Sequence, residues 1–249
     1  EIQRGLMTPP PVDQNGRISN NPGPTLDNDP LDFDVRIDYF RRTDDSVVAT
    51  LSIQAPNDQL TYKDLGGIQT AAINISGKVL QVSGKPAANF QDVVTTSATT
   101  EELRTVSDRS SIYQKTIVLA PGIYKTEIKV RDIDSGKTGD RRIGFTVPKY
   151  DPAKLSTSTL VLASRLQQTN ESDIGSMFVI GDKKVVPNLS RKYKQGQEVG
   201  LYLQIYNSGI DQTTLRPAID VEYDLSRIGG ETRRIREDWT GMSESGQRL

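Results

Sequence analysis

Carboxylates are the side chains whose types and spacing come nearest to catalytic chemistry in this sequence. Asp27, Asp29, Asp32 and Asp34 recur over a short stretch, and paired carboxylates can act as general acid and base. These residues fall on a linker and on the outward side of a predicted strand, which favours solvated charge. A hydrolase is therefore the least favoured of three functional hypotheses, after the two given at the end of this section. Two buried, facing carboxylates about 5–10 Å apart would favour it.

A second acidic stretch, RDIDSGKTGD, places Asp132, Asp134 and Gly136 at alternate positions. Oxygen ligands at this spacing suit calcium, but the twelve-residue loop and its closing bidentate Glu are missing. Asp, Ser and Gly are also the residues that hairpin turns prefer. The stretch predicts a turn, and we expect no metal site.

The composition excludes several classes of function. The chain has no histidine and no cysteine, which removes Ser-His and Cys-His nucleophiles, His-ligated metals, disulfides and thiolate-ligated clusters. The 31 basic and 32 acidic residues are well mixed, so no basic stripe predicts nucleic-acid binding. No run of about 18 apolar residues predicts a transmembrane helix. We expect neither a cofactor nor an enzymatic activity.

The stretch from Ile112 to Val147 predicts three strands separated by a Pro-Gly turn and a Gly-rich turn. From Tyr124 the side chains alternate, so Tyr124, Thr126, Ile128 and Val130 share one face and Ile123, Lys125, Glu127 and Lys129 the other. One apolar and one wet face indicate an antiparallel strand on a core. Pro121, Gly122 and Tyr124 form the predicted structural turn, in which Tyr124 bonds the backbone like the tyrosine corner of sandwich domains.

Further strands are predicted at 32–40, 47–53, 68–80 and 88–95, with a helical turn at 101–106. The core side of the first two strands is expected to hold Phe33, Val35, Ile37, Tyr39, Val47, Ala49, Leu51 and Ile53. About seven strands with short polar turns match an immunoglobulin-like β-sandwich over residues 31–148.

The remaining chain divides into three parts. Residues 1–30 contain six prolines and predict an extended arm or linker. Residues 149–157 form an interdomain joint, and 158–249 a second β-sandwich. This second sandwich has about five predicted strands and no second Pro-Gly-x-Tyr turn, so we expect it to be incomplete at the C-terminus, with open strand edges. The predicted fold class is all-β, with tandem immunoglobulin-like antiparallel sandwiches.

The strongest strand of the second part is predicted at 198–206. Val199, Leu201, Leu203 and Ile205 are expected to face its core, so Tyr202 and Tyr206 would point to the opposite side. With Trp239 they are the candidate interaction residues, because exposed aromatic side chains often anchor protein partners or sugars. Structural packing is the alternative explanation for these aromatic residues.

Several strings resemble a known family. They are LDFDVRIDYFRRTDDSVVATLSIQAPNDQLTYKD, INISGKVLQVSGK with FQDVV, SIYQKTIVLAPGIYKTEIKVRDIDSGKTG, LSTSTLVLAS, FVIGDKKVVPN and EVGLYLQIYN. In this order, over roughly 31–207, they resemble the C-terminal half of the GWxTD domain-containing proteins, which are bacterial and frequent in Acidobacteria. The Gly-Trp-x-Thr-Asp motif itself is absent, and the family supplies no catalytic residues to transfer. The resemblance implies export to the cell envelope (periplasm or cell surface).

These observations lead to one main functional hypothesis. The chain is expected to be a non-catalytic protein-interaction or scaffold module of an exported envelope protein, binding a protein partner or further copies of itself. Binding would use buried aromatic and aliphatic anchors or strand addition at an open edge. The alternative is a carbohydrate-binding accessory module, which predicts a flat row of exposed aromatic residues.

Overall fold

A computed structural model describes residues 31–170, 173, 176–215 and 217–236, and these residues form almost entirely antiparallel β-structure. Within them, helical structure is limited to short pieces such as α1 (Leu103–Ser107) and the 3₁₀ turn Asn57–Gln59. The predicted all-β class is confirmed at the level of antiparallel sheets. The predicted arm at 1–30 and the candidate Trp239 lie outside the described residues.

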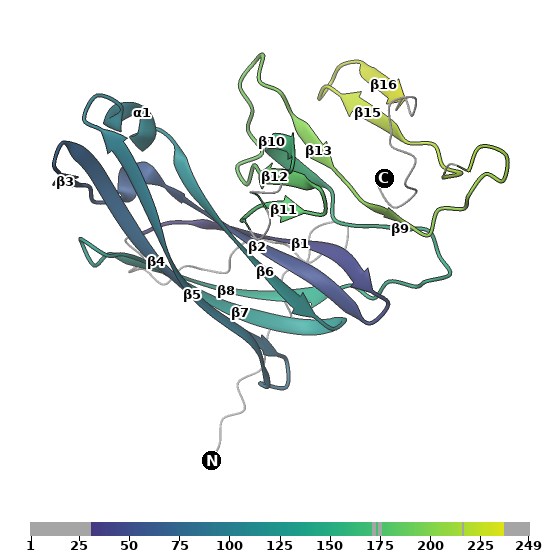
Figure 1. Cartoon of the computed structure of the whole chain (residues 1–249), viewed down its shortest axis with the longest axis horizontal. Helices are drawn as coiled ribbons and strands as arrows, with labels where there is room; N and C mark the ends of the chain where they lie inside the picture. Colours follow the sequence, from purple (N-terminus) through teal and green to yellow (C-terminus); the bar gives the residue numbers. More distant parts are fainter. Residues whose placement is uncertain (1–30, 171–172, 174–175, 216, 237–249) are drawn as a thin grey trace.

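Two antiparallel sheets enclose the main hydrophobic core, and we call this part, from Leu31 to Val147, the first unit (Figure 1). One sheet has the order β1-β2-β6 and consists of β1 (Asp34–Thr43), β2 (Ser46–Pro56) and β6 (Ser110–Leu119). The other has the order β5-β4-β7-β8, and β3 extends it by pairing with the start of β4. Its strands are β3 (Lys63–Leu65), β4 (Ile68–Gln81), β5 (Pro86–Thr99), β7 (Gly122–Asp132) and β8 (Thr138–Val147).

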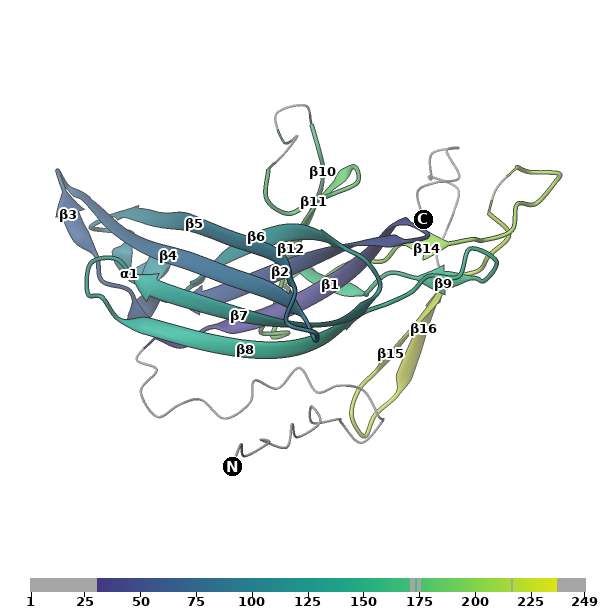
Figure 2. The ribbon, with the colours of Figure 1, turned by 90° about the horizontal axis from the view of Figure 1, so that it is seen from below.

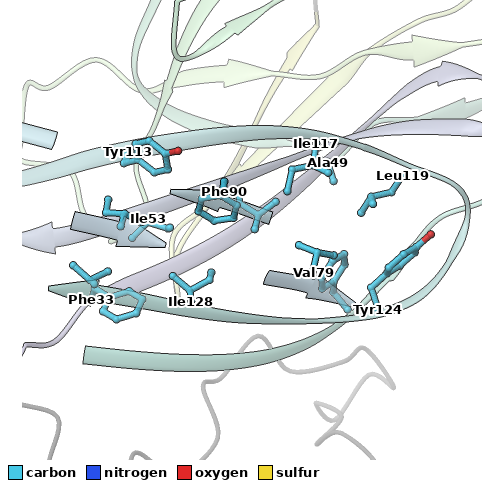
Figure 3. Packing of buried hydrophobic residues seen from close by; sticks show 14 of the residues in the cluster. Phe33, Ala49, Ile53, Val79, Phe90, Tyr113, Ile117, Leu119, Tyr124 and Ile128 are labelled. Atoms are coloured by element: carbon cyan, nitrogen blue, oxygen red, sulfur yellow. The ribbon is translucent and has the colours of Figure 1, made fainter. Parts of the chain in front are cut away.

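The core of the first unit follows the alternation of buried and exposed side chains that the sequence predicts. Along β7 the even-numbered side chains from Tyr124 to Val130 are buried, whereas Lys125, Glu127 and Lys129 are exposed, as predicted. The predicted inward residues of β2 are buried as well. Figure 3 shows how side chains from both sheets, such as Ile53 and Ile128, meet in one apolar layer. Burial of this apolar area is the main force that holds the two sheets together.

A smaller second unit follows and consists of short strands. β10 (Val161–Gln168), β11 (Val179–Ile180), β12 (Lys183–Pro187) and β13 (Gly200–Tyr202) form a sheet of order β11-β12-β10-β13. β9 (Ser156–Thr157) pairs with β14 (Ile205–Tyr206). A separate hairpin joins β15 (Glu222–Ser226) and β16 (Thr232–Arg236). In both views this hairpin lies away from the sheets of the first unit (Figures 1 and 2).

The core of the second unit differs from the one that the sequence predicts. It contains Val161, Ala163, Ile180 and Val185, but it is completed by Phe40 of β1. Val48 of β2 and Tyr202 pack against the same cluster. The second unit is therefore seated on the outer face of the β1-β2-β6 sheet and does not enclose an independent core.

The predicted strand at 198–206 is interrupted, because its middle changes partner. β13 pairs with β10, whereas β14 pairs with β9. Between them the Gln204 backbone carbonyl oxygen accepts a bond from the Ser158 backbone N–H (2.8 Å), and the Gln204 backbone N–H donates to Ser158 Oγ (2.9 Å). The sequence pattern shows alternation over the whole stretch but cannot show that two different strands receive its two ends.

Candidate functional site

Tyr206 lies at the centre of the joint between the two units. Only 9% of the residue is exposed, and its ring packs edge-on against Tyr150, with 5.3 Å between the ring centroids. The Arg41 guanidinium carbon lies over the Tyr206 ring, 4.7 Å from its centroid. The Tyr206 hydroxyl accepts a hydrogen bond from the Arg41 backbone N–H (2.9 Å) and donates one to Gln204 (2.7 Å). Burial raises the pKa of Tyr206 to about 12, so the hydroxyl stays protonated and keeps its donor role.

Asn207 continues this joint with a left-handed backbone, φ +60°, which Asn tolerates better than most residues. Its side-chain oxygen accepts a bond from Arg41 Nη1 (2.8 Å). Its amide nitrogen donates to the carbonyl oxygens of Asp151 (3.0 Å) and Lys154 (2.8 Å). One side chain thus fixes the predicted interdomain joint to β1.

Tyr202 is turned the same way as Tyr206, and the structure corrects the orientation that the sequence predicts for both. The Tyr202 ring packs on Phe40 with 6.0 Å between centroids, and its hydroxyl donates to the Ile180 carbonyl oxygen (3.3 Å). In contrast, Val199, on the predicted core face, is 51% exposed. The side of this segment that carries Tyr202 and Tyr206 faces the first unit, because the outer surface of the first unit is partly apolar. These two rings therefore make intramolecular contacts.

A buried ion pair lies on that same outer surface. Asp38 is 1% exposed and accepts bonds from the Arg36 guanidinium, with Nε at 2.8 and 3.0 Å from its two oxygens. Arg36 Nη2 also donates to the Leu160 carbonyl oxygen of the second unit (2.7 Å). Burial raises the pKa of Asp38, and the neighbouring Arg36 charge opposes this rise. This pair was not predicted from the sequence, although the polar side chains between apolar residues on β1 were a signal for it.

Gln114 of β6 forms a second polar link. Its amide nitrogen donates to Ser52 Oγ (3.1 Å), and its oxygen accepts the backbone N–H of Phe178 (3.1 Å). Phe178 has φ +70°, which is unusual for an aromatic residue, so the bond holds a strained turn in place. Together with the β1 contacts, this link fixes the second unit at two separate points.

At the predicted turn, Pro121 and Gly122 precede a buried Tyr124. The Tyr124 hydroxyl donates to the Ala120 carbonyl oxygen at 2.9 Å, which is the backbone bond that the sequence predicts. Its ring stacks on Phe145 with 5.7 Å between centroids. Gly122 has φ +154°, and a Cβ there would lie 3.6 Å from the tyrosine ring. The turn therefore has a packing role, close to the core (Figure 3).

Asp132 also has a structural role, within the turn that follows β7. Its carboxylate accepts bonds from the backbone N–H groups of Thr61 (2.8 Å) and Asp134 (3.0 Å) and from the Ser135 hydroxyl (2.9 Å). Burial opposes ionisation, but the bonds from Ser135 and Thr61 hold the pKa of Asp132 below its ordinary value. Asp134 instead pairs with Lys63. Among the described residues, no cluster of three or more acidic side chains could hold a metal ion.

The other predicted acidic residues are not brought together as a catalytic pair. Asp32 pairs with Arg141, whose guanidinium lies over the Phe33 ring. Asp34 is exposed at the start of β1, while Asp27 and Asp29 lie outside the described residues. In the part of the chain that the structure describes, no helix is long and apolar enough to cross a membrane.

The β15–β16 hairpin is amphipathic. In its register Tyr223 lies opposite Ile235 and Leu225 lies opposite Arg233, so three of the four side chains on this side are apolar or aromatic, whereas the alternate positions are all polar. On the polar side Asp224 accepts two bonds from Arg234 (2.8 and 3.1 Å). On the other side Leu225 is 59% exposed and Ile235 is 40% exposed. Among the described strands, the hairpin pairs with no further strand.

Comparisons with known proteins give only distant likenesses. The sequence matches no protein-family model and no curated protein. The X-ray structure of a Northeast Structural Genomics Consortium target is similar over 50% of this chain and 89% of that chain, at 16% identity and a TM-score of 0.30. A glycosyl hydrolase family 2 member from Bacteroides cellulosilyticus is similar over 47% of this chain and 15% of that chain, at 12% identity and a TM-score of 0.34.

Proposed function

We propose that this chain is a non-catalytic protein-interaction module in which two joined β units present an exposed hairpin to a protein partner. The observation that carries the proposal is the amphipathic β15–β16 hairpin, with its apolar side chains exposed and its edges unpaired among the described strands. Two-stranded hairpins are at best marginally stable in water. A partner that covers the apolar side would stabilise the hairpin and gain contact area.

The joint between the two units, which we call the frame, supports this role. Tyr206, Asn207 and Gln114 bond the second unit to the first at several points. Such a joint limits relative motion, so binding would require little additional ordering of the frame. A rigid support with an exposed anchor is the arrangement that interaction modules need.

The disposition of the buried acids favours binding over catalysis. Asp38 is neutralised by Arg36, and Asp132 is saturated by backbone and hydroxyl donors. Carboxylates held in this way contribute to structure and are poorly placed to exchange protons with a substrate. For the described residues, these contacts support the non-catalytic hypothesis.

Two finer parts of the proposal rest on the sequence. We infer that the first unit is an immunoglobulin-like sandwich, an inference that the tyrosine bond of Tyr124 to Ala120 supports. The resemblance to the C-terminal region of GWxTD domain-containing proteins supports export to the bacterial cell envelope. Fractionation of the native cells, with the chain followed by antibody, tests this localisation; recovery in the cytoplasm alone would contradict it.

The binding proposal is tested with hairpin variants. We expect Leu225→Asp/Ile235→Asp to lose the partner that co-purifies stoichiometrically with the wild-type chain from its native source, or to lose self-association measured by light scattering. Val118→Asp/Ile123→Asp adds the same charge at two exposed apolar positions of the first unit and serves as the matched control. Equal retention by both variants, or a wild-type chain that is monomeric and purifies alone, would contradict the proposal.

A further inference from the structure

The outer face of the β5-β4-β7-β8 sheet carries an uneven distribution of charge. Its inward side chains pack in the core, and the alternate positions point to solvent. On this face the charged side chains of the three adjacent strands β4, β7 and β8 are five basic and two acidic, namely Lys78, Lys125, Lys129, Arg131 and Arg142 against Glu127 and Asp140. The whole chain has a net charge of −1, so positive charge is concentrated here.

Most of this positive charge is available to a ligand. Arg142 lies 3.5 Å from Glu127, at the long end of ion-pair distances. Lys125, Lys129 and Arg131 occupy outward positions of β7, and Glu127 lies between the first two. The three cations form no ion pair with another described residue. Outward positions on one strand repeat about every 7 Å, so these three cations follow one line along the face.

Uncharged polar groups lie beside the cations. In the observed register, one row across the sheet runs from Gln91 through Ser76 to Lys129. The next row runs from Val93 through Asn74 to Arg131. Because adjacent strands lie about 4.8 Å apart, amide, hydroxyl and cationic groups fall within the span of a few sugar units. The amides and hydroxyls can both donate and accept, as sugar hydroxyls require.

The chemistry of this face discriminates between classes of partner. Protein interfaces have apolar or aromatic centres with few charges, whereas charged and amide side chains dominate these two rows. Single-stranded nucleic acids need aromatic stacking platforms, and none of the outward residues of these strands is aromatic. A duplex backbone calls for uninterrupted cationic contacts, but Glu127 interrupts the line of cations on β7, and Asp140 of β8 lies opposite Lys129. A carboxylated sugar chain matches both kinds of group on this face, because its carboxylates suit the cations and its hydroxyls suit the uncharged polar side chains.

We propose that the outer face of the β5-β4-β7-β8 sheet binds an acidic polysaccharide. The cations of β7 contact the carboxylates of the polymer, and Asn74, Ser76 and Gln91 bond its hydroxyl groups. This surface belongs to the first unit and uses none of the hairpin residues on which the proposed protein-interaction role rests. The two proposals can therefore fail independently.

The test measures binding of the whole chain to polygalacturonate by isothermal titration calorimetry. We expect the variant Lys125→Gln/Lys129→Gln/Arg131→Gln to bind at least about tenfold more weakly, because each exposed ion pair contributes modestly and three are lost. The control, Lys154→Gln/Lys192→Gln/Lys194→Gln, removes the same charge from exposed positions of the joint and the second unit and should bind within about twofold of wild type. A circular dichroism melt establishes that each variant is folded.

Two further arms identify the class of ligand. Asn74→Ala/Gln91→Ala keeps the charge, and we expect it to weaken polygalacturonate binding while leaving the weaker binding of a single-stranded DNA oligonucleotide unchanged. Fully methyl-esterified pectin lacks the carboxylates and should not bind. The proposal is overturned if the wild-type chain does not bind polygalacturonate, if the β7 variant binds like the control, or if DNA or an acidic peptide binds as tightly as the polysaccharide.

Discussion

Two tyrosine hydroxyls show how much one hydrogen bond matters in this core. Tyr124 donates to Ala120, whereas the Tyr62 hydroxyl is buried and has no hydrogen-bond partner among the described residues. We expect Tyr124→Phe to lower the free energy of unfolding by about 1 kcal/mol, because the Ala120 carbonyl loses its donor. The matched variant Tyr62→Phe removes an unpaired polar group and should be neutral or stabilising. Urea denaturation of both variants makes the comparison, and equal losses would contradict it.

Asp132 gives a prediction about pH. Its folded-state pKa is lowered, so its contribution to stability is present above the unfolded pKa of about 3.9 and is lost as the pH falls through the folded pKa. We expect Asp132→Asn to be less stable than wild type at pH 7, with a flatter loss of stability between about pH 5 and pH 2. Denaturant unfolding at a series of pH values measures both effects.

The control for this variant is Asp44→Asn, which changes an exposed acid in the β1–β2 turn. Its pH profile should follow that of the wild type. If Asp132→Asn and wild type lose stability in parallel on acidification, the carboxylate of Asp132 does not supply the linkage.

At the scale of the elements, the close approach of Leu31 to β8 depends on Gly139. A Cβ at Gly139 would lie 1.9 Å from the Leu31 carbonyl oxygen, and that backbone atom cannot move without displacing its neighbours. We expect Gly139→Ala to reduce the free energy of unfolding by about 3 kcal/mol, the upper end of overpacking effects. Gly144→Ala on the same strand meets nothing within 4 Å and serves as the control. A thermal melt that shows no difference between the two would refute the steric argument.

The elements also show which parts of the fold follow from sequence alone. β7 alternates so regularly that its buried face, its exposed face and its tyrosine turn are all predictable from local pattern. The orientation of Tyr202 and Tyr206 is not, because Val199 to Tyr206 is apolar on both faces. Which face is buried depends on Phe40 and Val48, about 150 residues earlier, and local periodicity does not carry that information.

The contacts of the candidate site could not be predicted from the sequence for the same reason, since local periodicity carries no information about distant parts of the chain. Asp38 and Gln114 are polar residues on strands, and sequence patterning assigns such residues to solvent. They are buried because another part of the chain covers them. The carboxylate turn at Asp132 was predictable, since Asp, Ser and Gly specify turns locally. The isolation of the β15–β16 hairpin from the other described sheets is a tertiary property, which a local sequence pattern does not reveal.

At the scale of the whole molecule, the shared core predicts that the two units unfold together. Phe40 is 2% exposed and completes the cluster of Val161, Ala163, Ile180 and Val185. We expect wild type to show a single cooperative transition in calorimetry. Phe40→Ala should lower the free energy of unfolding by about 3–5 kcal/mol and make the second unit the first region cut by protease.

Ile123→Ala, at an exposed position of β7, is the control for truncation of a large side chain and should change stability little. Two well-separated transitions in wild type would show that the second unit folds on its own. Uniform protease resistance of the folded Phe40→Ala variant would lead to the same conclusion.

The bond between β1 and Thr159 has a consequence for biosynthesis. The Tyr39 backbone N–H donates to the Thr159 hydroxyl, and the Thr159 backbone N–H donates to the Tyr39 carbonyl oxygen. Two residues further along β1, the Arg41 backbone N–H donates to the Tyr206 hydroxyl. A ribosome that has finished β8 still needs roughly 3–12 s to translate the next ~60 residues. Until then the nascent first unit exposes Phe40, Val48 and an unpaired strand edge. Protection by a chaperone, or fast translation of this interval, would therefore determine how much of the newly made protein escapes aggregation.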